Sequence, residues 1–337
     1  MFNLTEMNKK KNNLLEQIEN NYSDQALYDF RTYCRISLFC YNKKDDKYKK
    51  EYLNLVDNFD FYMNSDYDSF LNSLSEFVKK NYFLFYDPKD VKLRRMKLSL
   101  EELIDLSKEF YCKYFDEEFS ELACKIYEDS NSMNVCKKFY DINRKCFGLT
   151  FYDHTNNIPY PVIRRTNTLI DAQSFNHEVM HAIDFYMQPK YFDKYNNSFC
   201  EIVTYAIDYI FLDFLEEKKA NSNEIDKLRI QKMNYILSII KEIKILNKIY
   251  RDSGFMINSK NDLLKEQMKL EATVISYLMY EKYLNGDYIS DFKKLIHNVI
   301  LRSEKPDFNF IGFTDDMILE KSKIYVKKYV EMKNLTK

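Results

Sequence analysis

Residues 169–188, LIDAQSFNHEVMHAIDFYMQ, form the segment that decides the fold. The segment contains no glycine or proline and Pro189 follows it, which predicts a helix that ends just before the proline. Apolar side chains occupy most of the helix surface, and a narrow polar stripe that includes His177, His181 and Asp184 interrupts them. Such a helix is expected to be buried, so its polar groups need partners.

Two of the four histidines of the chain, His177 and His181, stand four residues apart on this helix. Residues i and i+4 lie on one helical face about one turn apart, so both imidazoles can bind the same metal ion. Glu178 lies about 100° around the helix and can reach a water on the open side of that metal. The order H-E-x-x-H is typical of zinc peptidases. The alternative is two core histidines that ordinary hydrogen bonds satisfy.

A third ligand is expected from a later helix, because His-His-Glu zinc sites take one carboxylate and leave the fourth position for water. Glu201 lies twenty residues after His181, at the start of an apolar run that predicts another buried helix. Ser198-x-x-Glu201 is also a capping box, in which the glutamate only closes the helix N-terminus. Asp184 and Asp208 are other available acids and candidates to support a ligating histidine by hydrogen bonding.

Several segments of the chain resemble the thimet oligopeptidase and oligoendopeptidase F family of zinc metallopeptidases. The matching order is a KxxG stretch (residues 145–148), a proline-containing strand (159–163) and an approach segment (167–171) before H-E-x-x-H. Residues 199–208 are similar to the family helix that carries the third zinc ligand, and residues 276–286 are similar to a late helix with a Tyr-Glu-Arg-Tyr-like tetrad. The resemblance implies a short, divergent member with a helical zinc-peptidase fold, one zinc ion per chain and peptide substrates.

The chain departs from the family pattern near the site. Met180 stands where the family has glycine, and the connection to Glu201 is shorter. The family carries a histidine and tyrosines just ahead of the late helix, where they hydrogen-bond the developing oxyanion. Residues 259–267 contain neither residue type. Other candidates for oxyanion or substrate contacts are Tyr277, Tyr280, Tyr250, His154 and Arg164.

The residues and the resemblance predict the same chemistry. Zinc held by His177, His181 and Glu201 lowers the pKa of its water to about 7, and Glu178 accepts the proton and delivers it to the leaving amine. We expect a zinc-dependent endopeptidase that hydrolyses oligopeptides. The alternatives are a His-His-Glu zinc protease that acts on a specific folded protein, and a catalytically weak peptide-binding homologue.

Two short strand patterns precede the zinc-motif helix. Residues 147–152 and 160–164 are separated by a polar loop, 153–159, that is rich in turn formers, which predicts a β-hairpin. Pro159 and Pro161 favour an edge position for the second strand, because proline cannot donate a ladder hydrogen bond. Such an edge can pair with an extended peptide. The alternative is a plain hairpin that braces the helix.

Helix patterns dominate the rest of the chain, and the scarcity of glycine (4) and proline (5) disfavours an all-β fold. We expect a mainly α fold with a small β-hairpin or sheet beside the zinc-motif helix. An N-terminal helical lobe (1–95) and a catalytic region (96–337) are expected to pack as one unit. Further helices are predicted over residues 5–22, 24–42, 65–81, 99–128, 201–219, 221–254, 261–284, 288–302 and 315–333.

Composition limits the expected partners and location. Lys plus Arg (51) and Asp plus Glu (52) nearly cancel, so nothing indicates a nucleic-acid partner. No run approaches about 18 apolar residues, so no membrane span is expected. The seven cysteines are odd in number and widely spaced, and residues 1–21 contain no apolar signal-peptide core. We expect a cytoplasmic protein with reduced thiols, and no pattern sets its oligomeric state.

Overall fold

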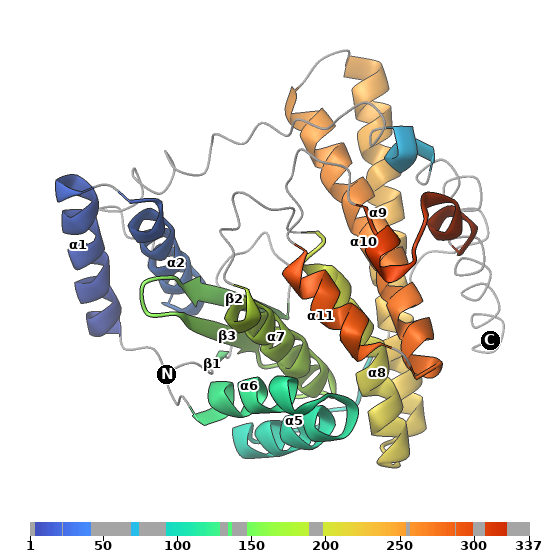
Figure 1. The fold of residues 1–337 in the computed structure, drawn as a ribbon, viewed down its shortest axis with the longest axis horizontal. Coiled ribbons are helices and arrows are strands. Elements are labelled where there is room, and N and C mark those ends of the chain that lie inside the picture. The colour runs from blue at the N-terminus through green and yellow to red at the C-terminus, as the bar shows by residue number, and fades with distance from the viewer. Residues whose placement is uncertain are drawn as a thin grey trace. The chain divides into compact units, whose positions relative to one another are not determined.

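The computed structural model describes residues 4–21, 23–41, 69–73, 92–128, 134–136, 147–188, 198–253, 257–286, 288–298 and 307–321. The described chain is mainly helical, with one small three-stranded sheet (Figure 1). This confirms the expected fold class. The chain divides into two compact units, residues 1–59 with 94–191 and residues 60–93 with 192–337. The expected division near residue 95 stays a prediction.

The sheet of the first unit is built on the predicted β-hairpin. Strand β2 (Gly148–Asp153) pairs antiparallel with β3 (Ile158–Arg164). The short strand β1 (Asn134–Cys136) pairs parallel with β3 over residues 162–164. The strand order is β1-β3-β2, so β3 is central and the prediction that it lies at a sheet edge is wrong.

The register explains how a strand with two prolines can be central. Pro159 and Pro161 lie opposite Tyr152 and Thr150 of β2, whereas β1 reaches only Val162 and the residues after it. Among the described residues, the prolines therefore stand where β3 is paired on one side, and their missing N–H groups interrupt no bond to β1. Within the described sheet, β3 is thus paired on one side over its first half, which contains both prolines, and on both sides over residues 162–164.

One face of the sheet is covered by α1 (Leu4–Asn20) and α2 (Asp24–Tyr41), which lie where the sequence predicts them. Ser23 caps α2, since its Oγ accepts a hydrogen bond from the Ala26 amide at 3.1 Å. Alternate strand residues enter the apolar cluster that these helices share with the sheet. The buried members of the cluster are Met7, Leu14, Ala26, Phe30, Tyr33, Ile36, Phe151, Tyr160 and Val162.

The zinc-motif helix, α7 (Ile170–Met187), packs against the strand residues that alternate with that cluster. Tyr152 of β2, for example, stacks on Phe185 of α7 with ring centroids 4.8 Å apart. Helices α5 (Leu100–Tyr114) and α6 (Glu117–Glu128) also pack on α7. The sheet and these two helices therefore bury most of the apolar surface that the sequence predicts for α7.

Residues 99–128 form two helices where the periodicity predicts one. The capping box that opens α5 is confirmed, with Ser99 and Glu102 each bonding the amide of the other. Phe115 is extended, and its ring packs on that of Phe119 with centroids 5.2 Å apart. Asp116 Oδ1 then accepts a hydrogen bond from the Phe119 amide at 3.3 Å. Aromatic packing and a second N-cap thus separate α5 from α6.

The second unit contains a bundle of long helices. Helices α8 (Glu201–Glu217), α9 (Ser222–Ser253) and α10 (Ile257–Leu284) pack on one another, and α11 (Ile289–His297) packs on α8 (Figure 1). All four lie within or close to their predicted ranges, and α11 ends before the predicted position. Most of two further predicted helices lies outside the described residues, namely 65–81 and 315–333.

Candidate metal centre

The loop before α7 is organised by Asp171, which is buried in the first turn of the helix. Its Oδ1 accepts hydrogen bonds from the amide and hydroxyl of Thr166 at 2.7 and 2.6 Å, and its Oδ2 accepts one from the Asn167 amide at 3.0 Å. The Arg165 guanidinium lies 3.6 Å from Oδ2. A carboxylate at a helix N-terminus also interacts favourably with the helix dipole. These contacts fix where α7 begins, and hence where its motif side chains lie.

Asn176, directly before the motif, ties α7 to α5. Its Oδ1 accepts a hydrogen bond from Ser107 Oγ at 2.7 Å, and its carbonyl oxygen accepts one from the Tyr111 hydroxyl at 3.0 Å. Its Nδ2 donates to the Ala172 carbonyl oxygen at 2.9 Å. This buried amide is therefore bonded through both its oxygen and its nitrogen. Rotation of α7 about its axis would break these bonds, so the network holds the motif in one orientation.

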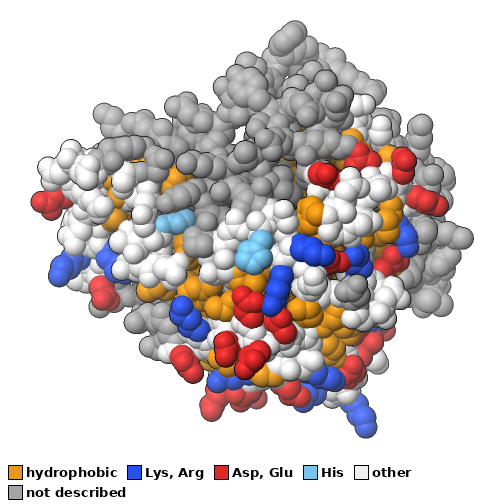
Figure 2. Space-filling view, viewed as in Figure 1, with side chains coloured by type: hydrophobic (Ala, Val, Ile, Leu, Met, Phe, Trp, Pro, Cys, Tyr) orange, Lys and Arg blue, Asp and Glu red, His pale blue; other side chains and the backbone are white. Residues whose placement is uncertain are grey.

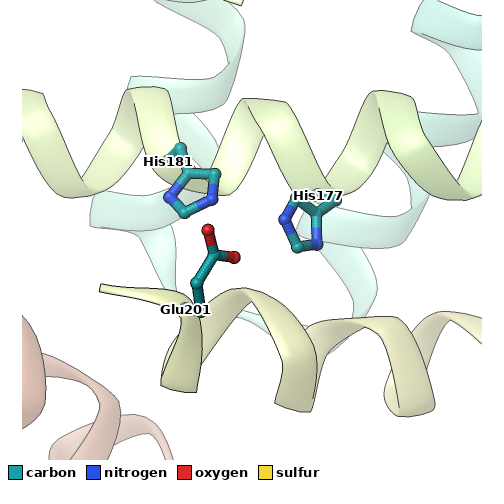
Figure 3. Close-up of side chains that lie close together, drawn as sticks. All are labelled: His177, His181 and Glu201. Atoms are coloured by element: carbon teal, nitrogen blue, oxygen red, sulfur yellow. The ribbon is translucent and has the colours of Figure 1, made fainter. Parts of the chain in front are cut away.

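His177 and His181 project from the same face of α7, as the i, i+4 spacing predicts (Figure 3). Their ring centroids lie 4.9 Å apart, with the ring planes at 77°. One nitrogen of each ring and a carboxylate oxygen of Glu201 lie within 4.8 Å of one another, and all three side chains are half-buried. Among the described residues, these three side chains form the group that could hold a metal ion. Two imidazoles and one carboxylate match the donor set of catalytic zinc sites.

Glu201 is the first residue of α8, and Figure 3 shows its carboxylate directed toward the two imidazoles. Thr204 Oγ1 lies 3.2 Å from Glu201 Oε2 and 3.0 Å from the Glu201 carbonyl oxygen. Cys200 occupies the N-cap position and makes no side-chain cap hydrogen bond. Helix α8 therefore does not begin with the alternative capping box, which requires Ser198 at the N-cap.

Glu178 lies against strand β2, and its side chain is buried, at 4% exposure. Thr150 Oγ1 lies 2.7 Å from Glu178 Oε2 and 3.0 Å from the Glu178 carbonyl oxygen. A Cβ atom at Gly148 would lie 2.4 Å from Glu178 Oε1 and 2.5 Å from its Cγ, which is too close for any real Cβ contact. The Glu178 carboxylate thus occupies the space that a side chain at position 148 would fill, and the hydroxyl of Thr150 hydrogen-bonds to it.

The two acids predicted to support a ligand are both buried. Asp208 lies two turns beyond Glu201 on α8, and its Oδ2 forms an ion pair with Lys232 Nζ of α9 at 2.8 Å. Asp184 lies on α7, about one turn beyond His181, and its carbonyl oxygen accepts a hydrogen bond from the amide of the residue that ends the helix. A supporting role for either carboxylate stays a prediction.

The late-helix tyrosines lie in an aromatic cluster. Tyr277 is 5% exposed, and its ring contacts those of Tyr209 and Tyr280 at centroid distances of 6.1 and 6.3 Å. The Tyr280 hydroxyl donates to Asp213 Oδ2 at 2.8 Å. Packing and this hydrogen bond account for both positions, and an oxyanion role for either tyrosine stays a prediction.

The other contact candidates are placed as follows. His154 lies in the β2–β3 turn, where its amide donates to Asp29 Oδ1 of α2 at 2.5 Å. Burial lowers the pKa of the His154 imidazole to about 4, so this ring is neutral at pH 7. Arg164 lies over the ring of Phe147, 4.9 Å from its centroid. The side chain of Tyr250 lies outside what the structure describes.

Two tyrosines that the sequence does not single out lie near Glu201. Tyr205 follows Glu201 by one helical turn, and its hydroxyl lies 2.9 Å from that of Tyr235 on α9. Burial raises the pKa of Tyr205 well above 10, and the negative charge of Glu201 adds to the rise. Burial, with a contribution from Glu201, raises the pKa of Tyr235 to about 12. The i, i+4 spacing is a signal for Tyr205, but it is weak in a chain with 29 tyrosines.

The described surface shows no segregation of charge on the face drawn in Figure 2, where acidic and basic side chains are intermixed with apolar ones. Intermixed charges of both signs weaken the long-range field of a surface. Among the helices that the structure describes, none has the length and apolar character needed to cross a bilayer.

The sequence matches no protein-family model and no curated protein. The fold is similar to those of solved structures. A candidate oligoendopeptidase F from Bacillus anthracis str. Ames has a TM-score of 0.50 over 95% of this chain at 13% identity. A second candidate oligoendopeptidase F has a TM-score of 0.55 over 94% at 12% identity, and PZ peptidase A, solved with an inhibitor, has 0.55 over 94% at 13% identity. This chain spans less than two thirds of each structure, at 65%, 66% and 66%.

The resemblance drawn from the H-E-x-x-H segment and its neighbours is thus confirmed in three dimensions. Identities of 12–13% establish the architecture alone, and that architecture extends over nearly all of this chain. The chain has the fold of the oligoendopeptidase F-like peptidases.

Proposed function

We propose that this chain is a zinc-dependent endopeptidase that acts on oligopeptides, with His177, His181 and Glu201 as zinc ligands and Glu178 as the general base. The observation that carries the proposal is the approach of two imidazole nitrogens and one carboxylate oxygen to within 4.8 Å of one another. The fold shared with oligoendopeptidase F structures supports peptides as the substrate class.

The side chains of the protein have distinct tasks in this proposal. Zinc, when bound, supplies an activated water and polarises a peptide carbonyl. Glu178, which follows the ligand His177 in the chain, takes a proton from water and gives it to the leaving amine. The hydrogen bond from Thr150 holds the Glu178 carboxylate in place before substrate binds, and the absence of a side chain at Gly148 leaves room for it. Preorganisation of this kind avoids the entropy cost of ordering the base during the reaction.

Metal content tests the ligand set. We expect one zinc ion per chain in the wild-type protein, and a large loss of zinc in Glu201→Ala, measured by elemental analysis after dialysis against a weak chelator. Glu217→Ala is the matched control, because Glu217 is an exposed acid at the other end of α8. Unchanged zinc content in Glu201→Ala would remove Glu201 from the ligand set.

Turnover tests the base. Glu178→Gln should keep its zinc and cleave quenched fluorescent peptides at least about 10²-fold more slowly. A fully active Glu178→Gln protein would exclude Glu178 as the base. Cleavage of short peptides but not of casein would favour an oligopeptidase over a protease of larger proteins. Zinc-loaded protein that binds members of a broad peptide library and cuts none would instead support a peptide-binding homologue.

A further inference from the structure

Strand β2 lies at one edge of the described sheet, and the register shows which of its residues face outward. In an antiparallel pair, every second residue exchanges hydrogen bonds with its partner, and the residues between direct their N–H and C=O groups away. Phe147 and Arg164 stand at a bonded position, because the Phe147 carbonyl oxygen accepts a hydrogen bond from the Arg164 amide at 2.7 Å. The backbone groups of Gly148, Thr150 and Tyr152 are therefore directed away from β3.

The two prolines of β3 agree with this alternation. Pro159 stands opposite Tyr152, and Pro161 stands opposite Thr150. Proline has no N–H to donate, so both prolines stand where β3 gives β2 no hydrogen bond.

Helix α2 packs on β2 and closes the far end of this outward edge (Figure 1). Gln25, Asp29 and Thr32 are spaced i, i+4 and i+7, so they share one face of α2. Thr32 Oγ1 donates to the Tyr152 carbonyl oxygen at 3.1 Å. Gln25 Nε2 donates to the His154 carbonyl oxygen at 2.7 Å, and Asp29 Oδ1 accepts a hydrogen bond from the His154 amide at 2.5 Å. These side chains therefore occupy the edge from the Tyr152 carbonyl oxygen onward.

Gly148 and Thr150 form the part of the edge that α2 leaves open. Within the described chain, no hydrogen bond reaches their outward backbone groups. Gly148 is half-buried, and because glycine has no side chain, its exposed surface belongs to the backbone. The proposed base lies beside both residues, since Glu178 Oε2 accepts the hydrogen bond from Thr150 and Oε1 fills the space next to Gly148. An open strand edge is a template for an extended peptide.

The open part of the edge is short. Residues in a strand rise by about 3.3 Å each, so the outward carbonyl oxygen of Tyr152 comes about 7 Å after that of Thr150. A paired peptide would place its own N–H at the Tyr152 carbonyl oxygen, where Thr32 Oγ1 already lies at 3.1 Å. The space between Thr150 and this closed position accommodates about two residues of a peptide.

We propose that α2 limits the length of the substrate: a peptide that pairs with β2 at Gly148 and Thr150 cannot continue along the edge past Tyr152. The inference rests on the proposed peptidase function and adds a length limit on one side of the cleaved bond. Antiparallel pairing is the more stable arrangement, and a peptide paired in this way runs from Tyr152 toward Gly148. The limited side is therefore the N-terminal side of the cleaved bond.

A nested series of quenched peptides tests the limit. The peptides share one cleaved bond and differ by single residues added on its N-terminal side. We expect kcat/KM to rise over about two added residues. Further residues should lower kcat/KM by roughly 2- to 10-fold, because they meet α2 and draw the peptide away from one hydrogen bond with the edge.

Variants of α2 connect the limit to its cause. A double variant, Gln25→Ala with Thr32→Ala, releases the two carbonyl oxygens of the hairpin that these side chains bond. It should raise kcat/KM of the long peptides relative to the short ones by about 2- to 10-fold. Ser37→Ala is the matched control, because Ser37 also lies on α2 but accepts its hydrogen bond from Lys11 of α1. It should leave the ratio unchanged, and the ratio does not depend on how much of a variant is folded.

Binding of the same peptides to Glu178→Gln supplies a readout independent of turnover. The Kd, measured by calorimetry, should be lowest for the peptide length that gives the highest kcat/KM in the wild-type protein. If kcat/KM does not fall with long N-terminal extensions, or if the ratio is unchanged in the double variant, this inference is overturned and the peptidase proposal stands. A wild-type protein that binds zinc and cuts no peptide would overturn both.

Discussion

Gly148→Ala tests how strand β2 holds the proposed base. A Cβ at position 148 would lie 2.4 Å from Oε1, 2.5 Å from Cγ and 2.7 Å from Cδ of Glu178. Nonbonded carbon atoms are at their optimal separation near 3.5–4.0 Å, so the Glu178 side chain has to move by about 1 Å. The backbone of Gly148 is not in the left-handed region. The added methyl therefore acts by direct contact with Glu178, without backbone strain.

The displacement should affect turnover more than stability. It breaks the 2.7 Å hydrogen bond between Thr150 Oγ1 and Glu178 Oε2, and overpacking of this size costs about 1–3 kcal/mol of the free energy of unfolding. Misplacing a catalytic group by about 1 Å can cost roughly 10²-fold in rate. We therefore expect kcat to fall about 10²-fold. Zinc content should be unchanged, because the nearest atoms all belong to Glu178 and none to a proposed ligand.

Three measurements and a control variant at a second glycine, Gly312, make the test specific. Cleavage of a quenched peptide gives kcat, elemental analysis gives zinc content, and urea unfolding gives stability. Gly312→Ala is the control, because φ at Gly312 is 79° and a Cβ there would meet no described atom within 4 Å. It should cost about 1–2 kcal/mol through backbone strain and leave kcat unchanged.

Two results would refute the reasoning on Gly148. Wild-type kcat in Gly148→Ala would mean that the Glu178 carboxylate does not occupy the space beside β2 in the active protein. A loss of the same factor when Gly148→Ala is added to Glu178→Gln would mean that the effect does not run through the base, since that background already lacks it.

Other side chains around α7 and the hairpin give further predictions. Thr150→Val removes the hydroxyl that donates to Glu178, so steady-state kinetics should show kcat about 10- to 10²-fold lower, an unchanged KM and rescue by Thr150→Ser; wild-type kcat in the valine variant would contradict this role. Burial is the main cause that raises the pKa of Asp29 from 3.8 to about 6, so its contribution to stability is complete below a pH of about 4 and is lost as the pH rises through about 6. Urea unfolding should therefore show wild-type stability falling relative to Asp29→Asn by about 1–3 kcal/mol between a pH of about 4 and about 7; a constant difference would contradict the assignment. Phe175→Ala removes a buried ring stacked on that of Tyr127 with centroids 6.2 Å apart and should cost about 3–5 kcal/mol in urea unfolding, whereas a cost below about 1 kcal/mol would mean that the ring is loosely packed.

The sequence by itself determined the features that depend on near neighbours along the chain. His177 and His181 share a face because four residues complete about one helical turn, whatever packs around them. The capping box at Ser99 and the turn of the hairpin are equally local, and both lie where the sequence predicts them. Local patterns also predicted buried helices at residues 170–187 and 201–217, since the spacing of apolar residues can be read from their order along the chain.

The tertiary structure alone decided which distant residues meet. Thr150 holds Glu178 across 28 positions, and Tyr205 meets Tyr235 across 30. The periodicity of a segment does not identify its partner. An apolar face indicates that the face is buried, but it does not indicate which element covers it. The central position of β3 likewise depends on β1, whose three residues carry almost no strand signal of their own. The three proposed ligands could thus be listed from spacing, while the contacts that hold Glu178 required the packed chain.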